Sequence, residues 1–312
     1  MTAGSTPVGV AWGRQDGPGG QPMEIWAAAK INLFLRVLER RPDGYHTIET
    51  VFQSVGLADR LWFEVSGEEV VLDCGNSDLP VDRENLIVRA AELMQERFPG
   101  RVRGMRIRLE KRIPAGGGLG GGSADAAATL RACDDLFGLG LSADELRKLG
   151  AQLGMDVPFL IQGGRAIGRN RGEQIESLEM RDRMWAVIAV PAPAISTRWA
   201  YEKLDQREPS QLARVEEFVG RLLKEPLARW APMCGNDFER VVFPVYPEVK
   251  QLRDRLLAAG CAGAFLSGSG AAVVGLTDDP EQAAAVAREM GRWCGRAEAV
   301  PFLDAVGAAS GQ

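Results

Sequence analysis

Long apolar runs are missing from this sequence. The longest, such as Trp185 to Pro191, are far shorter than the roughly 18–20 residues that a membrane-spanning helix needs, which argues against an integral membrane protein. An excess of one charge is also missing, because 37 basic residues face 42 acidic ones and the formal net charge is −5. That balance gives no general attraction to nucleic acid. We therefore expect neither a membrane nor a nucleic-acid partner.

Histidine and paired cysteines are equally scarce. The chain has one histidine and five scattered cysteines, with no Cys-x-x-Cys pair. This pattern disfavours both a disulfide framework and a zinc site, and it is typical of reduced thiols in a cytoplasmic protein. With 46% hydrophobic and 25% charged residues, the composition is that of a globular protein with enough apolar matter for a core.

Residues 1–21 differ in composition from the rest of the chain. They are rich in Gly, Pro, Ser and Thr, with neither the apolar core of a signal peptide nor the arginine excess of a transit peptide, so we predict a disordered extension. Ordered sequence is expected from residue 22. Charged residues at 178–184 separate two strand patterns, which predicts an N-terminal domain, 22–180, and a C-terminal domain, 181–312.

Apolar periodicity predicts a mixture of helices and strands, the α+β class. Helices are expected at Asn85 to Phe98, at Ser123 to Phe137 and, after a Ser142/Glu145 capping box, through Leu153. Val157 to Glu176 has many glycines and alternating apolar residues, which predicts strands and turns. The other expected helices are Pro247 to Ala259, Pro280 to Met290 and one after Ser196; the expected strands are Glu24 to Leu38, Leu61 to Val65, Val70 to Asp73, Met105 to Leu109, Trp185 to Val190, Ala264 to Leu266, Ala272 to Leu276 and Ala297 to Phe302.

A glycine-rich run between a strand pattern and an alanine-rich helix is the strongest functional signal. From Gly116 to Gly122, every residue except Leu119 is glycine. Without Cβ atoms, successive backbone N–H groups can converge on an anion, and the following helix adds free N–H groups and a partial positive charge. Ser123 can add a hydroxyl to a phosphate or a magnesium ion. The pattern predicts a phosphate-binding loop.

Two other interpretations of the glycine run stay open. One is a flexible linker, although linkers are not normally bracketed by a patterned strand and a helix. The other is a dinucleotide site, since Gly116-x-Gly118-x-x-Gly121 formally fits the fingerprint. A match inside six glycines is weak evidence, and no clear βαβ unit surrounds it. A Walker A loop is excluded, because no Gly-Lys-Ser/Thr follows.

Four stretches, in order along the chain, resemble the GHMP kinases, and in particular the diphosphocytidyl-methylerythritol kinase family among them. The likeness extends from about residue 24 to about residue 304. Pro114 to Ala124 is similar to the phosphate loop of that family, Ala29 to Leu35 with Arg41 to His46 to its N-terminal signature, Leu153 to Phe159 to its Gly-Ala-Asp-Val-Pro motif, and Leu266 to Ala271 to its C-terminal glycine loop.

The resemblance implies a two-domain GHMP kinase, with an N-terminal domain like ribosomal protein S5 and a ferredoxin-like C-terminal domain. Such an enzyme uses ATP and Mg²⁺ to phosphorylate a small cytidine diphosphate-linked methylerythritol. The implied catalytic pair is Asp156, as the acceptor of the hydroxyl proton, and Lys30 beside it. From the residues alone, Asp156 could instead cap a helix or turn, and Lys30 could reach out from a strand edge.

The resemblance also implies which residues bind each partner, with Ser123 as a possible contact of Mg²⁺. The implied ATP-binding residues are Asn85, Lys111, Pro114, Ala115, Gly116, Gly117, Gly118, Leu119, Gly120, Gly121, Gly122, Ser123 and Ala124. The implied substrate-binding residues are Asn32, Tyr45, His46, Thr197, Tyr201, Gly268 and Ser269.

Two positions depart from the family pattern. Ala124 stands where a second serine is usual, and Met155 replaces the small residue before the aspartate. Another GHMP small-molecule kinase, a non-catalytic nucleotide-binding regulator and a dinucleotide-dependent oxidoreductase stay as alternatives. The Tyr45-His46 pair argues against the first, and retention of the Lys30 and Asp156 pair argues against the second. A monomer and a homodimer are equally compatible with the sequence.

Overall fold

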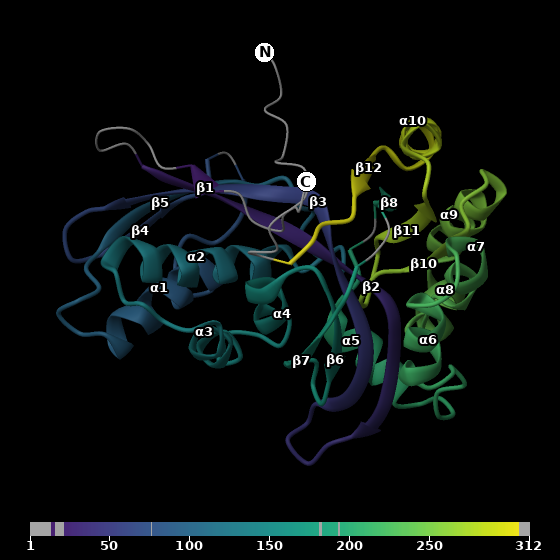
Figure 1. The fold of residues 1–312 in the computed structure, drawn as a ribbon, viewed down its shortest axis with the longest axis horizontal. Helices are drawn as coiled ribbons and strands as arrows, with labels where there is room; N and C mark the ends of the chain where they lie inside the picture. The colour runs from purple at the N-terminus through teal and green to yellow at the C-terminus, as the bar shows by residue number, and fades with distance from the viewer. Residues whose placement is uncertain (1–13, 16–21, 76, 181–182, 193, 306–312) are drawn as a thin grey trace.

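A computed structural model describes residues 14–15, 22–75, 77–180, 183–192 and 194–305 of the chain. Within these residues, eight strands form one mixed sheet and four form a second, antiparallel sheet (Figure 1). The predicted α+β class is confirmed. Of the predicted extension, residues 1–21, only Arg14–Gln15 (β1) is described, and it pairs antiparallel with the next strand. The rest of the extension lies outside the described residues.

The large sheet is built around a long antiparallel hairpin. Its two strands, β2 (Met23–Arg40) and β3 (His46–Val65), are joined by a turn that contains Pro42 and Gly44, two residue types that favour turns. Figure 1 shows this hairpin running from the first half of the molecule into the second. The other strands of the large sheet are β4 (Val70–Asp73), β5 (Met105–Glu110), β6 (Arg165–Arg169), β7 (Gln174–Leu178) and β9 (Gly235–Asn236).

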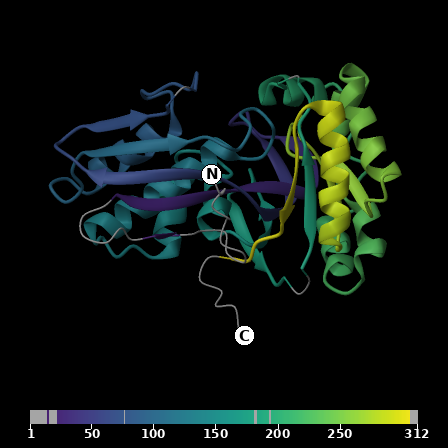
Figure 2. The same ribbon diagram turned by 90° about the horizontal axis from the view of Figure 1, so that it is seen from above.

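The small sheet has the order β10-β11-β8-β12. Figures 1 and 2 both place its helices on the side away from the large sheet, so the small sheet lies between them and the hairpin. Its strands are β8 (Trp185–Ala189), β10 (Gly263–Leu266), β11 (Val273–Thr277) and β12 (Ala297–Pro301), and the helices that cover it are α9 (Pro247–Ala258) and α10 (Pro280–Cys294).

In the first half, two helices pack against the β2–β3 hairpin, and the other two pack mainly on those helices. In the second half, shorter helices connect the small sheet to the end of the hairpin. The first-half helices are α1 (Leu86–Arg97), α2 (Gly121–Phe137), α3 (Ala143–Gly150) and α4 (Val157–Gln162). The connecting helices are α5 (Thr197–Leu204), α6 (Val215–Leu222), α7 (Leu227–Trp230), α8 (Glu239–Val245) and a 3₁₀ turn at Ala231–Met233.

The prediction of strands from residue 157 onward is wrong for its first part. Val157–Gln162 is a helix, and only the later residues form β6 and β7. Pro158 lies in the first turn of α4, where its missing N–H would have had no helical partner. Residues 157–161 are all buried, so no polar residue marks a helical face in a short apolar run.

Two connections tie the halves of the chain together. β9 pairs in parallel with β2 at Phe34 and Leu35, and Asp237 accepts a hydrogen bond from the Val37 N–H at 2.8 Å. The segment after β12 returns to the large sheet, where Phe302 bridges Val55. The predicted boundary at residues 178–184 falls between β7 and β8. We propose it as the point where the chain first passes from one sheet to the other.

Candidate active site

A cavity of about 560 Å³ opens where the hairpin, the glycine run and the second half of the chain meet. All of the predicted site residues line it except Ala124, which is fully buried within α2. The structure therefore brings together side chains from Lys30 to Ser269.

The glycine run forms a loop that leads directly into α2. Gly120 is the N-cap of that helix with φ of 71°, in the left-handed region that glycine tolerates, and it provides no side-chain cap. The first intrahelical bond runs from the Ala124 N–H to the Gly120 carbonyl at 2.8 Å. The N–H groups of the residues between them have no partner within the helix and lie at the positive end of its dipole. This end of α2 is suited to bind an anion.

A second glycine loop, residues 266–270, packs directly on the first. The Ser267 hydroxyl donates to the Gly118 carbonyl at 3.0 Å, and a Cβ at Gly118 would stand 2.0 Å from the Ser267 carbonyl oxygen. Asn236, which sequence reasoning missed, holds this loop by donating to the carbonyls of Leu266 and Gly268 at 2.8 and 2.7 Å. Each glycine loop thus depends on the other for its position.

Lys30 and Asp156 meet at the floor of the cavity. The Lys30 ammonium lies 3.4 Å from the Asp156 carboxylate and donates to the Asn32 side-chain oxygen at 2.7 Å and to the Gly118 carbonyl at 3.1 Å. Asn32 in turn donates to the Thr50 hydroxyl at 2.8 Å, which fixes the orientation of its amide. Lys30 is only 3% exposed, whereas the Asp156 side chain is 34% exposed. The pair therefore presents a carboxylate to the cavity, with a buried cation behind it.

Aromatic and hydroxyl side chains from β3, α5 and the second glycine loop line another side of the cavity. His46 stacks on Tyr201 with ring centroids 4.8 Å apart and planes at 17°. Burial raises the pKa of the Tyr201 phenol, and the Asp156 carboxylate raises it further, so the phenol stays neutral. The Thr197 and Ser269 hydroxyls are 2.8 Å apart.

Tyr45 and a neighbouring cation complete this side of the cavity. The Tyr45 side chain is half exposed, and the guanidinium of Arg171 lies over its ring at 5.2 Å from the centroid. Sequence reasoning missed Arg171, because nothing local in its turn distinguishes it from a solvated arginine. The two residues are 126 positions apart and meet only in the folded chain.

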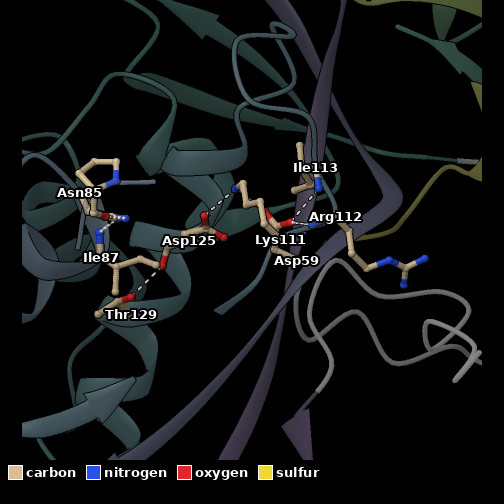
Figure 3. A network of polar contacts seen from close by, with 9 residues as sticks. Asp59, Asn85, Ile87, Lys111, Arg112, Ile113, Asp125 and Thr129 are labelled. Atoms are coloured by element: carbon tan, nitrogen blue, oxygen red, sulfur yellow. Dashed lines mark hydrogen bonds and ion pairs between the residues drawn. The ribbon is translucent and has the colours of Figure 1, made fainter. Parts of the chain in front are cut away.

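Lys111 and Asn85 also line the cavity, and each has protein partners of its own. The Asn85 side chain caps α1 by accepting from the Ile87 N–H at 3.0 Å. Figure 3 shows the Lys111 ammonium between two carboxylates, Asp59 at 2.6 Å and Asp125 at 2.7 Å. Neither aspartate was predicted from the sequence to be a site residue.

The Lys111, Asp59 and Asp125 cluster is almost entirely buried. Asp59 also accepts hydrogen bonds from the N–H groups of Arg112 and Ile113, whereas one Asp125 oxygen has no hydrogen-bond partner among the described residues. Burial raises the pKa of Asp125 to about 8 against the opposing effect of the Lys111 ammonium, and the Asp59 carboxylate adds to the rise. Burial works against the charged form of Lys111, but the two carboxylates raise its pKa overall. The cluster joins the segment that precedes the first glycine loop to the helix that follows the loop.

Two types of feature are missing from the part of the chain that the structure describes. None of its helices is long and apolar enough to cross a membrane. Groups of three or more His, Cys, Asp or Glu side chains suited to hold a metal ion are also absent from it.

Comparison with known proteins agrees with this geometry. The family model described as GHMP kinases N terminal domain matches residues 85–164, and GHMP kinases C terminal matches residues 218–296. A 4-diphosphocytidyl-2-C-methyl-D-erythritol kinase from Gloeobacter violaceus is 43% identical over 269 residues, covering 85% of this chain and 88% of the relative. One from Pelotomaculum thermopropionicum is 44% identical over 263 residues, covering 84% and 91%.

Solved structures give the same result. A crystal structure titled 4-(cytidine 5'-diphospho)-2C-methyl-D-erythritol kinase matches with a TM-score of 0.75 and 37% identity, covering 90% of this chain and 99% of the other. A homoserine kinase from Cytophaga hutchinsonii has a TM-score of 0.70 at 20% identity, covering 93% and 97%, and shares the fold alone. This chain is a small-molecule kinase that belongs to the 4-diphosphocytidyl-2-C-methyl-D-erythritol kinase family, a branch of the GHMP kinases.

Proposed function

We propose that this kinase transfers the γ-phosphoryl group of ATP to the 2-hydroxyl of 4-diphosphocytidyl-2-C-methyl-D-erythritol, a step in the non-mevalonate route to isoprenoids. The observation that carries the proposal is the 3.4 Å Lys30–Asp156 pair, which lies in the same cavity as the phosphate loop. Phosphoryl transfer needs neutralised phosphates, in-line positioning and an acceptor for the hydroxyl proton. The pair supports the third requirement, and the loop supports the first.

Asp156 is the proposed proton acceptor, and Lys30 its partner. The buried Lys30 ammonium lies beside the carboxylate that would accept the proton, and it offers a positive charge to the forming alkoxide. The hydrogen bonds of Lys30 to Asn32 and Gly118 hold it in place. Because Gly118 belongs to the phosphate loop, the position of the acid–base pair is linked to that of the phosphates.

Ser123 is the residue proposed to contact Mg²⁺. It stands in the first turn of α2 and lines the cavity, and Mg²⁺ commonly binds through one or two protein groups together with substrate phosphates. The lack of a larger ligand cluster among the described residues fits this arrangement. When bound, the ion supplies charge neutralisation to the phosphates. Ala124, buried inside α2, leaves no second hydroxyl for this purpose.

Substrate profiling tests the proposed function directly. The purified enzyme is supplied with ATP and, in separate coupled assays, with the diphosphocytidyl substrate, homoserine or mevalonate. We expect turnover with the first substrate alone. Preferential turnover of homoserine or mevalonate would identify another kinase activity on the same fold. Binding of ATP without turnover of any of them would favour a regulator.

A valine at position 120 is expected to weaken ATP binding about tenfold or more, an effect of about 1.4 kcal/mol or more. Its Cβ would lie 3.0 Å from Lys30 Cγ, its φ of 71° suits glycine, and its methyl groups would project where a phosphate has to approach. Titration calorimetry with ATP measures the change. Gly220→Val is the matched control, because Gly220 lies in α6 and a Cβ added there would meet no atom within 4 Å. Unchanged ATP affinity in a folded Gly120→Val enzyme would contradict the phosphate-loop assignment.

Removing the imidazole at position 46 is expected to raise KM for the cytidylyl substrate about tenfold and to leave KM for ATP within about twofold. His46 lines the cavity beside Tyr45 and Tyr201, so the loss should affect the base half of the substrate. Initial-rate kinetics on His46→Ala measures both constants. Thr47→Ala is the control, since Thr47 does not line the cavity and neighbouring strand residues face opposite ways. Equal increases in both KM values would remove His46 from the substrate pocket.

A further inference from the structure

The His46 side chain lines two cavities. Besides the active-site cavity, His46 lines a second cavity of about 410 Å³. Asp205, Leu38 and Glu39 also line this second cavity. The His46 Nε2 atom lies 2.6 Å from Asp205 Oδ1, on the side of the second cavity. Asp205 does not line the active-site cavity. Of the two side chains that its carboxylate contacts, His46 and Arg40, His46 is the one that lines the active-site cavity.

Asp205 is held in place for this contact. It is the C-cap residue of α5, and its N–H donates to the Tyr201 carbonyl at 3.0 Å. Its second carboxylate oxygen lies 3.6 Å from the Arg40 guanidinium. The same helix carries Tyr201, whose ring stacks on the imidazole and packs edge-on against Phe238 at 4.8 Å. One short helix therefore fixes both the plane of the imidazole and the partner of its Nε2.

The contact decides which nitrogen of a neutral imidazole carries the proton. A carboxylate accepts hydrogen bonds and donates none, so the short contact requires Nε2 to be the protonated nitrogen. In the neutral ring, Nδ1 then keeps its lone pair and can only accept a hydrogen bond. Among the described residues, no other side-chain hydrogen bond to His46 competes for that nitrogen.

We infer that Asp205 is a positioning residue that sets the base specificity of the enzyme by holding His46 as the Nε2–H tautomer. The inference rests on the proposed function, in which His46 faces the base of the substrate. Cytosine presents an amino group at position 4, a donor that Nδ1 can accept. Uracil presents a carbonyl oxygen there, and its lone pairs would face the lone pair of Nδ1. A site built to accept a hydrogen bond rejects an analogue that lacks the donor.

The tautomer can be measured directly, because His46 is the only histidine in the chain. Protein labelled with ¹⁵N at histidine gives a single imidazole, and its two nitrogen shifts distinguish a protonated nitrogen from an unprotonated one. At a pH where the ring is neutral, we expect a protonated Nε2 and an unprotonated Nδ1 in the free enzyme. In Asp205→Leu, we expect the shifts to move towards a mixture of the two tautomers. A protonated Nδ1 in the unaltered enzyme would overturn the inference, whatever substrate the enzyme uses.

Kinetics then tests the consequence for specificity. The unaltered enzyme should prefer the cytidine substrate to its uridine counterpart by about a hundredfold or more in kcat/KM. In Asp205→Leu this preference should fall about tenfold, through the KM of the cytidine substrate, while KM for ATP stays the same. Glu202→Leu is the matched control, because Glu202 is an exposed carboxylate on the same helix and does not line either cavity.

A double variant separates positioning from a general loss of structure. If Asp205 acts through the imidazole, Asp205→Leu should have no further effect on base preference in the His46→Ala background. An unaltered enzyme that turns over neither pyrimidine substrate would defeat the proposed function. If the unaltered enzyme is selective for cytosine and the Asp205→Leu variant keeps that full selectivity, this inference is wrong and the proposed function still stands.

Discussion

Asparagine in place of Asp156 is expected to lower kcat by about 10²–10⁴-fold, the usual contribution of a positioned general base. The substitution keeps the shape of the side chain and removes the basic carboxylate. ATP affinity should change little, because the phosphates are expected to contact the loop amides and Ser123 rather than Asp156. Pre-steady-state phosphoryl transfer, with ATP binding measured separately, checks both statements. Asp278→Asn serves as the control, since Asp278 is an exposed aspartate outside the cavity.

Lys30→Met should lower kcat as well, because the alkoxide loses its counter-charge. The two losses should not add in the double variant, since Lys30 and Asp156 are in contact and act as one unit. A folded Asp156→Asn enzyme that keeps most of its kcat, with chemistry shown to be rate-limiting, would rule out the base. Catalysis would then depend on positioning and electrostatics, which phosphoryl transfer permits.

Methionine in place of Lys111 is expected to lower the free energy of unfolding by about 3–5 kcal/mol, the usual cost of removing one partner from a buried ion pair. The side chains of Asp59 and Asp125 are 0% and 4% exposed, so neither carboxylate can recover its hydration when the ammonium is lost. Urea unfolding at neutral pH measures the loss. Lys148→Met, at an exposed site on α3, should change stability by less than about 0.5 kcal/mol.

The stability deficit of Lys111→Met should grow as the pH rises. A carboxyl whose folded-state pKa is raised stabilises the fold fully below its unfolded pKa and loses that contribution as the pH rises through the folded value. For Asp125 this window runs from its ordinary pKa of 3.8 to about 8. Without the Lys111 ammonium, Asp125 should bind its proton still more tightly in the folded state. The difference between the free energies of unfolding at acid and at alkaline pH should therefore be larger for the variant than for the unaltered enzyme.

The opposite outcome would assign Lys111 another role. Full stability together with a raised KM for ATP would make Lys111 an ATP ligand, as the family resemblance implies. Its two ion pairs favour the structural role, since a cation held between two carboxylates has less charge to offer a phosphate. The contacts in Figure 3 also help the glycine loop to keep its shape, because they join the residues just before the loop to the start of α2.

Features encoded over short stretches could be predicted from the sequence. The Ser142/Glu145 capping box is present at the start of α3, and the alternation from Met105 onward is strand β5. The arrangement of a strand, a glycine loop and a helix from β5 to α2 was predictable because the signals for all three follow one another directly along the chain. The pairing of Lys30 with Asp156 was implied by the resemblance to family motifs, and in the structure the Lys30 ammonium lies 3.4 Å from the Asp156 carboxylate.

Features that depend on distant partners could not be predicted. Only the end of β3, from Leu61, was recognised as a strand, because residues 50–55 in its middle are buried on both faces and show no alternation. His46 and Asp205 lie 159 positions apart, and Lys111 and Asp59 lie 52 apart. Asp59 and Asp205 each resemble a solvated aspartate in sequence. Their environment exists only once the chain has folded.

The return of β9 to β2 affects how the protein can be synthesised. Asp237 bonds to Val37, 200 positions earlier, and Ser269 lines the same cavity as Lys30. At about 5–20 residues per second, a ribosome needs roughly ten to forty seconds to make the 200 positions from Val37 to Asp237. During that time β2 has an open edge, where another nascent chain can pair. The nascent chain should therefore be protected by chaperones before it can be protected by bound ATP. Pulse proteolysis of stalled ribosome complexes should detect protection by ATP only after residue 269 has emerged.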